Sequence, residues 1–365
     1  MLVDLIAGAR PNFMKIAPIT HAITKAREEG KNIQFRLIHT GQHYDKNMSD
    51  SFFEQLHIPL PDVNLGAGGG TQAEQAAAIM VGYEKLLLDK KPDLCLVVGD
   101  VTSTMACAIA AQKLHVKVAH VEAGIRSGDW TMPEEINRLV TDSITNYFFT
   151  TSDVANRNLR ESGVSDDRIF FVGNTMIDTL LKNLPGLSRP AIWEEVKLEI
   201  GQYFVMTLHR PANVDEESKL KELLQEIVTH SKGLPLIFPV HPRTAKMLQG
   251  LGIDAPNLHF SEPMGYLEFN YLVKNAKAVI TDSGGITEET TVMGVPCMTL
   301  RDNTERPETV TVGTNELIGT NPKAIAPAMK MLFAGEWKKG EIPELWDGHT
   351  AERIVEILLR PGLLN

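Results

Sequence analysis

The segment HVEAGIRSGDWTMPEEINR, His120–Arg138, concentrates side chains of the types that transfer protons and bind anions. Four carboxylates, two arginines and a histidine lie within these nineteen residues, among them Glu122, Glu134 and Arg138. The apolar run VKVAHV leads directly into the segment and predicts a buried strand. So much charge at the end of a buried strand makes this segment a candidate functional site.

Polar residues also follow other apolar runs. Arg10 and Lys15 bracket the junction between a first strand and a helix, where two cations suit an anionic substrate. His209 and Arg210 end the first strand of the second half, and Asp100 closely follows the run LCLVV. Solvated surface charges, a structural histidine and a helix N-cap are the alternative interpretations. The common place of these residues at predicted strand ends, in both halves of the chain, favours function.

The stretch TDSGGITEET, residues 281–290, ends a strand and begins a helix with two glycines. Backbone N–H groups at a helix start carry partial positive charge, so Ser283, Gly284 and Gly285 suit a diphosphate. Glu289 lies one turn into the helix, where a carboxylate accepts hydrogen bonds from ribose hydroxyls. A plain capped helix start with glycines for tight packing is the alternative, and the motif alone does not decide between the two.

The elements that must position these residues alternate between strand and helix along 365 residues, a length that suits two domains. Predicted strands of the first half span 2–7, 35–39, 94–98, 118–121, 147–150 and 169–172. The rhythm resets near Gly173, and strands recur at 203–207, 236–240, 278–281 and 297–300. The pattern predicts an α/β fold of two doubly wound domains, residues 1–172 and 173–349, whose strand ends surround a ligand cleft.

Composition and missing motifs disfavour several classes of function. A formal net charge of −10 disfavours nucleic-acid binding, and no apolar run reaches the roughly 18 residues of a membrane span. The first residues are expected to form a strand rather than a signal peptide, and the three cysteines to be buried thiols, which predicts a cytoplasmic protein. P-loop, G-x-G-x-x-G and H-E-x-x-H motifs are absent, so neither a dinucleotide cofactor nor a metal is predicted.

Seven motifs occur in order between Gly8 and Glu308: GARPNFMKIAPI, HTGQHYD, VVGDVTST, HVEAGIRSGDWTMPEEINR, TLHRPANVD, TDSGGITEE and RDNTERPE. In these motifs the chain resembles the non-hydrolysing UDP-N-acetylglucosamine 2-epimerases over nearly its whole length. The resemblance implies GT-B architecture, with two Rossmann-like domains and a C-terminal helix, 350–365, that returns to the first. It also implies a homodimer, no cofactor, and a UDP-sugar as the only ligand.

The implied reaction interconverts UDP-GlcNAc and UDP-ManNAc by anti elimination of UDP to 2-acetamidoglucal, followed by re-addition. The C2 hydrogen is a very weak acid, but departure of UDP builds positive charge at C1 and makes that proton easier to lose. Inversion at C2 needs proton-transfer groups on both faces of the sugar, which several separately tuned carboxylates supply. The carboxylate-rich segment that begins at His120 fits this requirement.

The resemblance assigns roles by matched position. The residues matched to acid–base and leaving-group chemistry are Asp100, Glu122, Glu134, His209, Arg138 and Lys15. Those matched to substrate binding are Arg10, Ser283, Gly284, Gly285, Glu289, Phe269, Tyr266, His241 and Arg306, with Phe269 or Tyr266 beside the uracil. Gln42 and Arg210 match a second site, where UDP-GlcNAc acts as an activator. Arg138, four residues after Glu134, is expected to orient that carboxylate.

Departures from the family pattern leave alternatives open. The family often has HRREN where this chain has HRPAN, 209–213. The loop before PEE is shorter in this chain than in the best-known bacterial members. Many of those members have an arginine where this chain has Gly68–Gly70, and that arginine contributes to activation by a second UDP-GlcNAc. A 2-epimerase of a modified UDP-sugar such as UDP-2,3-diacetamido-glucuronate, and a GT-B glycosyltransferase, are the closest alternatives. A hydrolysing epimerase and a sugar-nucleotide sensor without turnover are further ones.

Overall fold

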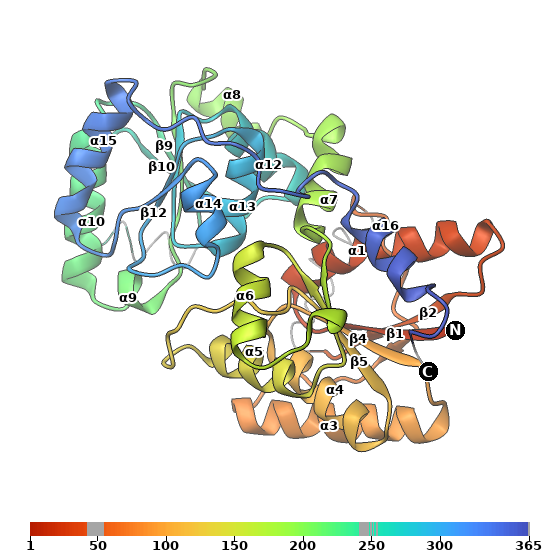
Figure 1. The fold of residues 1–365 in the computed structure, drawn as a ribbon. Helices are drawn as coiled ribbons and strands as arrows, with labels where there is room; N and C mark the ends of the chain where they lie inside the picture. Colours follow the sequence, from red (N-terminus) through yellow and green to blue (C-terminus); the bar gives the residue numbers. More distant parts are fainter. Residues whose placement is uncertain (42–54, 241–247, 249, 251, 253–254, 364–365) are drawn as a thin grey trace. The chain divides into compact units, whose positions relative to one another are not determined.

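The computed structural model describes residues 1–41, 55–240, 248, 250, 252 and 255–363; the side chains of Arg10, Pro11 and Pro211 lie outside this description. The chain forms two compact units, Met1–Lys182 with Glu344–Asn365, and Asn183–Pro343. Each unit contains one parallel sheet covered by helices, which confirms the predicted α/β class (Figure 1).

The first unit has a seven-stranded sheet in the order β3-β2-β1-β4-β5-β6-β7. Its strands are β1 Leu2–Ala7, β2 Gln34–His39, β3 Val63–Asn64, β4 Leu94–Val98, β5 Lys117–Val121, β6 Tyr147–Thr150 and β7 Ile169–Phe171. Its helices are α1 Arg10–Glu28, α3 Gln72–Asp89, α4 Thr102–Lys113, α5 Pro133–Ile144, α6 Asp153–Glu161, α7 Thr175–Asn183 and α16 Thr350–Leu358. All five residues of β4 are buried, because helices cover both faces of the sheet.

The C-terminal helix α16 belongs to the first unit and packs on α1. The buried carboxylate of Asp178 on α7 accepts the N–H groups of Thr350 at 3.1 Å and Ala351 at 2.7 Å, which satisfies the start of α16. These bonds tie α7 to the first unit as well. The sequence-based boundary at residue 172 precedes α7, whereas the compact unit extends to Lys182.

The second unit has a six-stranded sheet in the order β10-β9-β8-β11-β12-β13. Its strands are β8 Phe204–Thr207, β9 Leu236–Pro239, β10 Leu258–Ser261, β11 Ala278–Thr281, β12 Cys297–Thr299 and β13 Asn315–Leu317. Its helices include α8 Ala191–Val196, α9 Pro211–Val214, α10 Glu217–His230, α12 Tyr266–Asn275, α13 Gly284–Met293, α14 Pro307–Thr311 and α15 Ile325–Phe333. Phe204 and Met206 enter one apolar cluster, while Tyr203 and Val205 enter another, as alternation along β8 requires.

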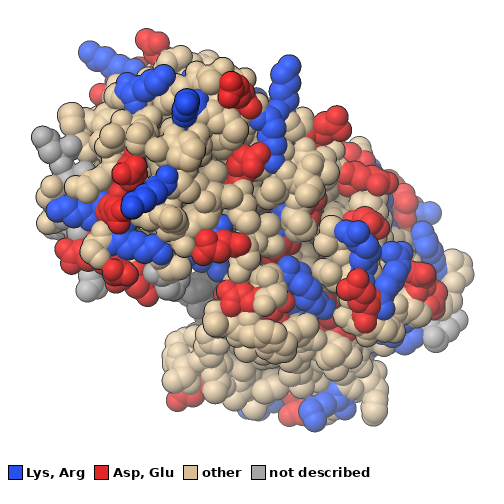
Figure 2. All heavy atoms as spheres, turned by 60° about the vertical axis from the view of Figure 1, so that its left-hand side comes forward, with Lys and Arg blue, Asp and Glu red and all other residues tan. Residues whose placement is uncertain are grey.

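Figure 2 shows acidic and basic side chains interspersed on the visible face of the molecule, without a continuous basic area. Within the described residues, no helix combines the length and apolarity that crossing a membrane requires.

Candidate active site

Three neighbouring strands of the first sheet end at one edge, because β1, β4 and β5 are adjacent and parallel. Lys15 lies on the second turn of α1, which begins shortly after β1. Asp100 follows β4, and Glu122 follows β5 directly. The fold therefore gathers these three predicted residues at a single sheet edge.

Lys15 and Glu122 form a buried ion pair at that edge. The Nζ of Lys15 donates to Oε2 of Glu122 at 2.7 Å, and the two side chains are 11% and 2% exposed. Gly99 makes room for the pair, since a Cβ at this position would lie 3.2 Å from the Lys15 ammonium, and its φ is +69°. The Nδ2 of Asn12 donates to the carbonyl of Val98 at 2.9 Å and ties the start of α1 to the end of β4.

Glu122 has a backbone φ of +69°, in the left-handed region that residues with a Cβ rarely adopt. Such a conformation costs on the order of 1–3 kcal/mol and persists where surrounding contacts hold it, often at functional sites. The N–H of Ala123 donates to Phe149 O at 3.1 Å, and the N–H of Gly99 donates to Val121 O at 3.0 Å. These backbone bonds hold the turn on both sides of Glu122.

Arg138 on α5 binds two carboxylates. Its Nε and Nη2 donate to Oδ2 of Asp100 at 3.0 and 2.6 Å, and its Nη1 donates to Oε2 of Glu135 at 2.7 Å. The side chain of Asp100 is 30% exposed, so this carboxylate is both held and accessible. Glu134 is half-buried in the first turn of α5. The orienting contact expected between Arg138 and Glu134 stays a prediction, whereas the observed contacts run to Asp100 and Glu135.

Glu135 was missed from the sequence, although its spacing of three residues from Arg138 is a recognisable signal. Burial raises the pKa of Glu135, but the N–H groups of Ser127 and Gly128 together with Arg138 outweigh burial and leave the pKa below its ordinary value. The carboxylate accepts the N–H of Ser127 at 2.9 Å and of Gly128 at 3.1 Å. Glu135 therefore shapes the loop that precedes α5.

In the second unit, His209 lies at the end of β8 and rests on Asp282, which follows β11. The Nδ1 of His209 is 2.8 Å from Oδ1 of Asp282, and the N–H of Arg210 and Nδ2 of Asn213 also donate to this carboxylate. Burial raises the pKa of Asp282, but these donors, His209 foremost, bring it below its ordinary value. His209 itself is 59% exposed and available to a ligand. Asp282 was not predicted, although it stands next to Ser283.

The start of α13 presents open N–H groups. Ser283 is the N-cap, and its side chain makes no capping bond to the helix. Gly284 lies close to Glu305, since a Cβ would come within 2.7 Å of its Oε1. A larger residue at Gly284 would therefore crowd the first turn. Unoccupied N–H groups and the helix dipole make this start a suitable seat for a diphosphate.

Glu289 lies in the interior of the second unit, with Tyr266 as its partner. The hydroxyl of Tyr266 donates to Oε1 of Glu289 at 2.9 Å. Burial raises the pKa of Glu289 to about 7, although the bond from Tyr266 opposes the rise. Tyr266 is buried, and Phe269 packs beside the apolar cluster that contains Leu272. A stacking role for either ring on uracil stays a prediction.

Of the remaining predicted residues, some have described side chains and some do not. Arg306 is buried, with its Nε 2.6 Å from Oε1 of Glu288, and Nη2 of Arg210 lies 3.9 Å from Oε1 of Glu305. Gln42 and His241 lie outside the described residues, as does the side chain of Arg10. Among the residues that the structure describes, no group of three or more histidine, cysteine or acidic side chains is placed to hold a metal ion.

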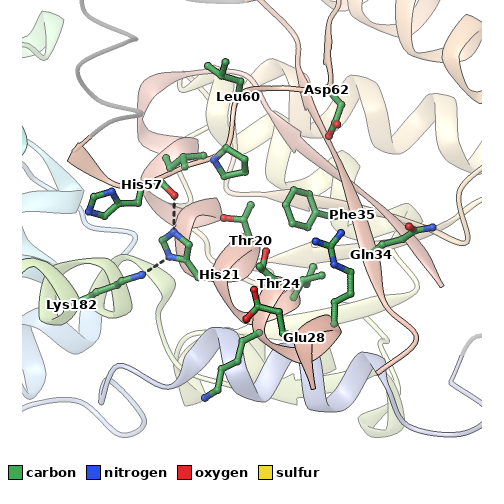
Figure 3. Close-up of a pocket in the computed structure, with 15 residues that line it drawn as sticks. Thr20, His21, Thr24, Glu28, Gln34, Phe35, His57, Leu60, Asp62 and Lys182 are labelled. Atoms are coloured by element: carbon green, nitrogen blue, oxygen red, sulfur yellow. Dashed lines mark hydrogen bonds between the residues drawn. The ribbon is translucent and has the colours of Figure 1, made fainter. Parts of the chain in front are cut away.

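A pocket of about 1280 Å³ lies elsewhere on the first unit, and none of the predicted site residues lines it (Figure 3). It is bounded by the second half of α1, the start of β2 and residues 57–62. His21 stands between Lys182 and the carbonyl of His57, at 2.7 and 2.9 Å. Charges of both signs line the pocket, so it selects no single class of ligand.

Comparison with known proteins shows the family of the chain. A family model described as UDP-N-acetylglucosamine 2-epimerase matches residues 25–359. The chain is 42% identical over 371 residues to the UDP-N-acetylglucosamine 2-epimerase of Methanocaldococcus jannaschii, and the match covers 98% of this chain and 99% of that protein. The chain belongs to the UDP-N-acetylglucosamine 2-epimerase family. It is an isomerase, as the motif set predicts.

A solved structure of the M. jannaschii relative and one further relative also match the chain. A crystal structure of the M. jannaschii enzyme in complex with UDP-GlcNAc and UDP superposes with a TM-score of 0.86, covering 98% of this chain and 99% of that one at 42% identity. The fold is accordingly of the GT-B type. The UDP-2,3-diacetamido-2,3-dideoxy-D-glucuronate 2-epimerase of Pseudomonas aeruginosa is 37% identical over 366 residues, covering 99% of this chain and all of that protein.

Proposed function

We propose that this chain interconverts UDP-GlcNAc and UDP-ManNAc without hydrolysis, by anti elimination of UDP and its re-addition. The observation that carries the proposal is the pair of cation-bound carboxylates at adjacent strand ends. Glu122 is held by Lys15, and Asp100 is held by Arg138. Two separately held carboxylates suit a reaction that removes a proton from one face of C2 and returns one to the other.

The leaving UDP requires groups that stabilise negative charge. The open N–H groups at the start of α13 suit its diphosphate, and His209 is supported by the buried carboxylate of Asp282. A histidine held in this way donates a hydrogen bond, or a proton, to a phosphate oxygen. Glu289 lies farther along α13, where it suits the ribose hydroxyls. The M. jannaschii structure, which holds UDP-GlcNAc and UDP, supports this class of ligand.

Proton NMR of the purified protein with UDP-GlcNAc in D₂O tests the proposal. UDP-ManNAc is expected to appear, and the C2 position of both sugars is expected to take up deuterium. Free ManNAc with UDP would identify a hydrolysing enzyme instead, and an unchanged, undeuterated substrate would contradict the proposal. The variant Glu134→Gln is expected to lose the conversion while UDP still binds.

A second candidate substrate is UDP-2,3-diacetamido-glucuronate. The 37% identity to the P. aeruginosa enzyme over nearly all of both chains favours it. The same NMR assay with both sugar nucleotides compares the two values of kcat/KM and decides between them. The homodimer implied by the family resemblance is part of the proposal, and sedimentation equilibrium measures it.

A further inference from the structure

A buried histidine lies between the two turns that carry Asp100 and Glu122. His120 on β5 has no exposed surface. Its Nδ1 is 2.7 Å from Oδ1 of Asp142, and its Nε2 is 2.8 Å from the carbonyl oxygen of Gly99. A carboxylate and a carbonyl both accept hydrogen bonds, so both ring nitrogens must donate. The ring of His120 is therefore placed to bridge Asp142 and the carbonyl of Gly99.

Asp142 on α5 is the counter-charge for this ring. Burial raises the pKa of Asp142, but His120 and Arg126 outweigh burial and leave the pKa below its ordinary value. Its Oδ2 accepts the N–H of Gly124 at 3.0 Å and lies 2.7 Å from Nη1 of Arg126. One carboxylate therefore binds the histidine and the loop that follows Glu122.

The bonds of His120 and Asp142 lead to both candidate carboxylates. Gly99 immediately precedes Asp100, and Gly124 lies two residues after Glu122. Both Gly99 and Glu122 have a φ of +69°, which glycine adopts freely, whereas Glu122 needs contacts that hold it there. The peptide of Gly99 is bound at both ends, since its N–H donates to Val121 and its carbonyl accepts from His120.

We infer that His120 and Asp142 are positioning residues for the proposed epimerisation, and that their bonds to Gly99 and Gly124 fix the turn of Asp100 against the turn of Glu122. The inference rests on the proposed function for its catalytic consequence. A buried charged pair is a poor device for stability alone, because apolar side chains of similar volume commonly serve as well. Its value here lies in joining two turns whose carboxylates must face one substrate.

Three variants separate positioning from simple support of the fold. His120→Gln keeps a donor in reach of Gly99, His120→Asn keeps one in reach of Asp142, and Asp142→Asn removes the counter-charge. Asp4→Asn is the matched control, because Asp4 is a buried carboxylate of the same unit that binds Arg36 at 2.7 Å and Tyr83 at 2.9 Å. All four are measured for kcat, KM, UDP affinity and melting temperature.

The expected result is a fall of about 100-fold in kcat for His120→Asn and Asp142→Asn, with KM and UDP affinity within about twofold of the wild type. His120→Gln is expected to retain more kcat than His120→Asn, since it preserves the bond to the turn of Asp100. Asp4→Asn is expected to lower the melting temperature without lowering kcat. If the four variants lose kcat only in proportion to stability, or if KM rises instead, the inference is wrong.

Crystal structures of His120→Gln and Asp142→Asn give a readout that does not depend on turnover. In Asp142→Asn, the peptide of Gly99 and the backbone of Glu122 are both expected to move from their wild-type positions. In His120→Gln, the peptide of Gly99 is expected to keep its wild-type position. Unmoved turns in both would overturn the inference. An inactive wild-type protein would overturn the proposed function alone, and the crystal structures would then still decide whether this pair holds the two turns.

Discussion

The two units prepare their candidate site residues in different ways. In the first unit, side chains of opposite charge hold one another, as in the pairs Lys15–Glu122 and Arg138–Asp100. The second unit also contains such pairs, His209–Asp282 and Arg306–Glu288. It adds candidate binding groups of another kind, which are the backbone N–H groups at the start of α13 and the buried acid Glu289, whose partner is the neutral hydroxyl of Tyr266. The first arrangement fixes charges for chemistry, and the second leaves a seat for the charge of the ligand.

The difference predicts how each unit responds to substitution. Removing one member of a buried ion pair leaves an uncompensated charge, which typically costs about 3–5 kcal/mol. Backbone N–H groups remain when a side chain is replaced, so a substitution at Gly284 disturbs the proposed diphosphate site only by crowding it. Substitutions in the strand-end pairs Lys15–Glu122 and Arg138–Asp100 are therefore expected to abolish turnover, and those at the start of α13 to weaken binding.

The largest expected effect is that of Glu122→Gln. The amide keeps the size of the side chain but removes the proposed base and the partner of Lys15, so kcat is expected to fall by about 10²–10⁴-fold. UDP affinity is expected to stay unchanged in calorimetric titration, because the proposed diphosphate site lies in the second unit. Glu352→Gln, at an exposed position of α16, is the control and is expected to keep full activity. Normal deuterium uptake at C2 in Glu122→Gln would contradict the proposed difference between the two units.

Gly284→Ala tests the second unit. The added Cβ would come within 2.7 Å of the Glu305 carboxylate, so either this side chain or the start of α13 must shift. UDP is expected to bind about tenfold more weakly, a loss of about 1.4 kcal/mol, with kcat less affected. Gly186→Ala is a matched control in the same unit, because its Cβ would have no atom within 4 Å. Equal losses of UDP affinity in Gly284→Ala and Gly186→Ala would show that the start of α13 has no special part in UDP binding.

The pH dependence of UDP binding tests the buried acid. Glu289 has a pKa of about 7 in the folded protein, raised by burial, so it is neutral below this pH and a carboxylate above it. An ionised acceptor binds ribose hydroxyls more strongly by about 1 kcal/mol, so affinity is expected to rise about fivefold as the pH passes through 7. Glu289→Gln is expected to remove this rise in affinity. Tyr266→Phe is expected to move the midpoint of the rise to a higher pH, because the Tyr266 hydroxyl stabilises the ionised form of Glu289 and is lost in this variant.

The same carboxyl group makes a prediction for stability. Because its folded pKa of about 7 exceeds the ordinary value of 4.5, the folded state binds more protons than the unfolded state in this window. The free energy of unfolding of the wild type is therefore expected to fall, relative to that of Glu289→Gln, as the pH rises from about 4.5 to 7. Chemical denaturation of both proteins across this range measures the difference, and parallel curves would contradict the raised pKa.

The smallest effect is expected at an exposed ion pair of the first unit. The ammonium of Lys25 lies 3.2 Å from Glu352, with side chains 64% and 46% exposed. Lys25→Met is expected to change the free energy of unfolding by less than about 1 kcal/mol and to leave kcat unchanged. A larger effect would show that ion pairs matter in this unit wherever they occur, rather than at the strand ends.

Local sequence signals predicted most of the fold. The continuous apolar run at 94–98 identified β4 with its bounds, because a strand buried on both faces needs no polar residue. The short edge strands β3 and β13, with two and three residues, carry no such signal and were missed. The junction between the first strand and the first helix was expected between Arg10 and Lys15, and the helix begins at Arg10, with Pro11 in its first turn.

The site was predictable as a set of strand ends, but not as a set of pairs. Asp142 binds His120 across 22 residues, and Asp282 supports His209 across 73. Such pairs depend on which strands are adjacent, which the spacing of residues along the chain does not encode. The resemblance named the residues of the motifs, while their supports became visible only in the folded chain.

The carboxylate of Asp178 beneath α16 has a consequence for synthesis on the ribosome. Asn183–Pro343 is continuous in sequence, so the second unit is complete before residues 344–365 are made. The first unit lacks α16 until residues 350–358 are made, and until then Asp178 has neither Thr350 nor Ala351 to bind. The half of the protein that is translated first is therefore the half that is finished last.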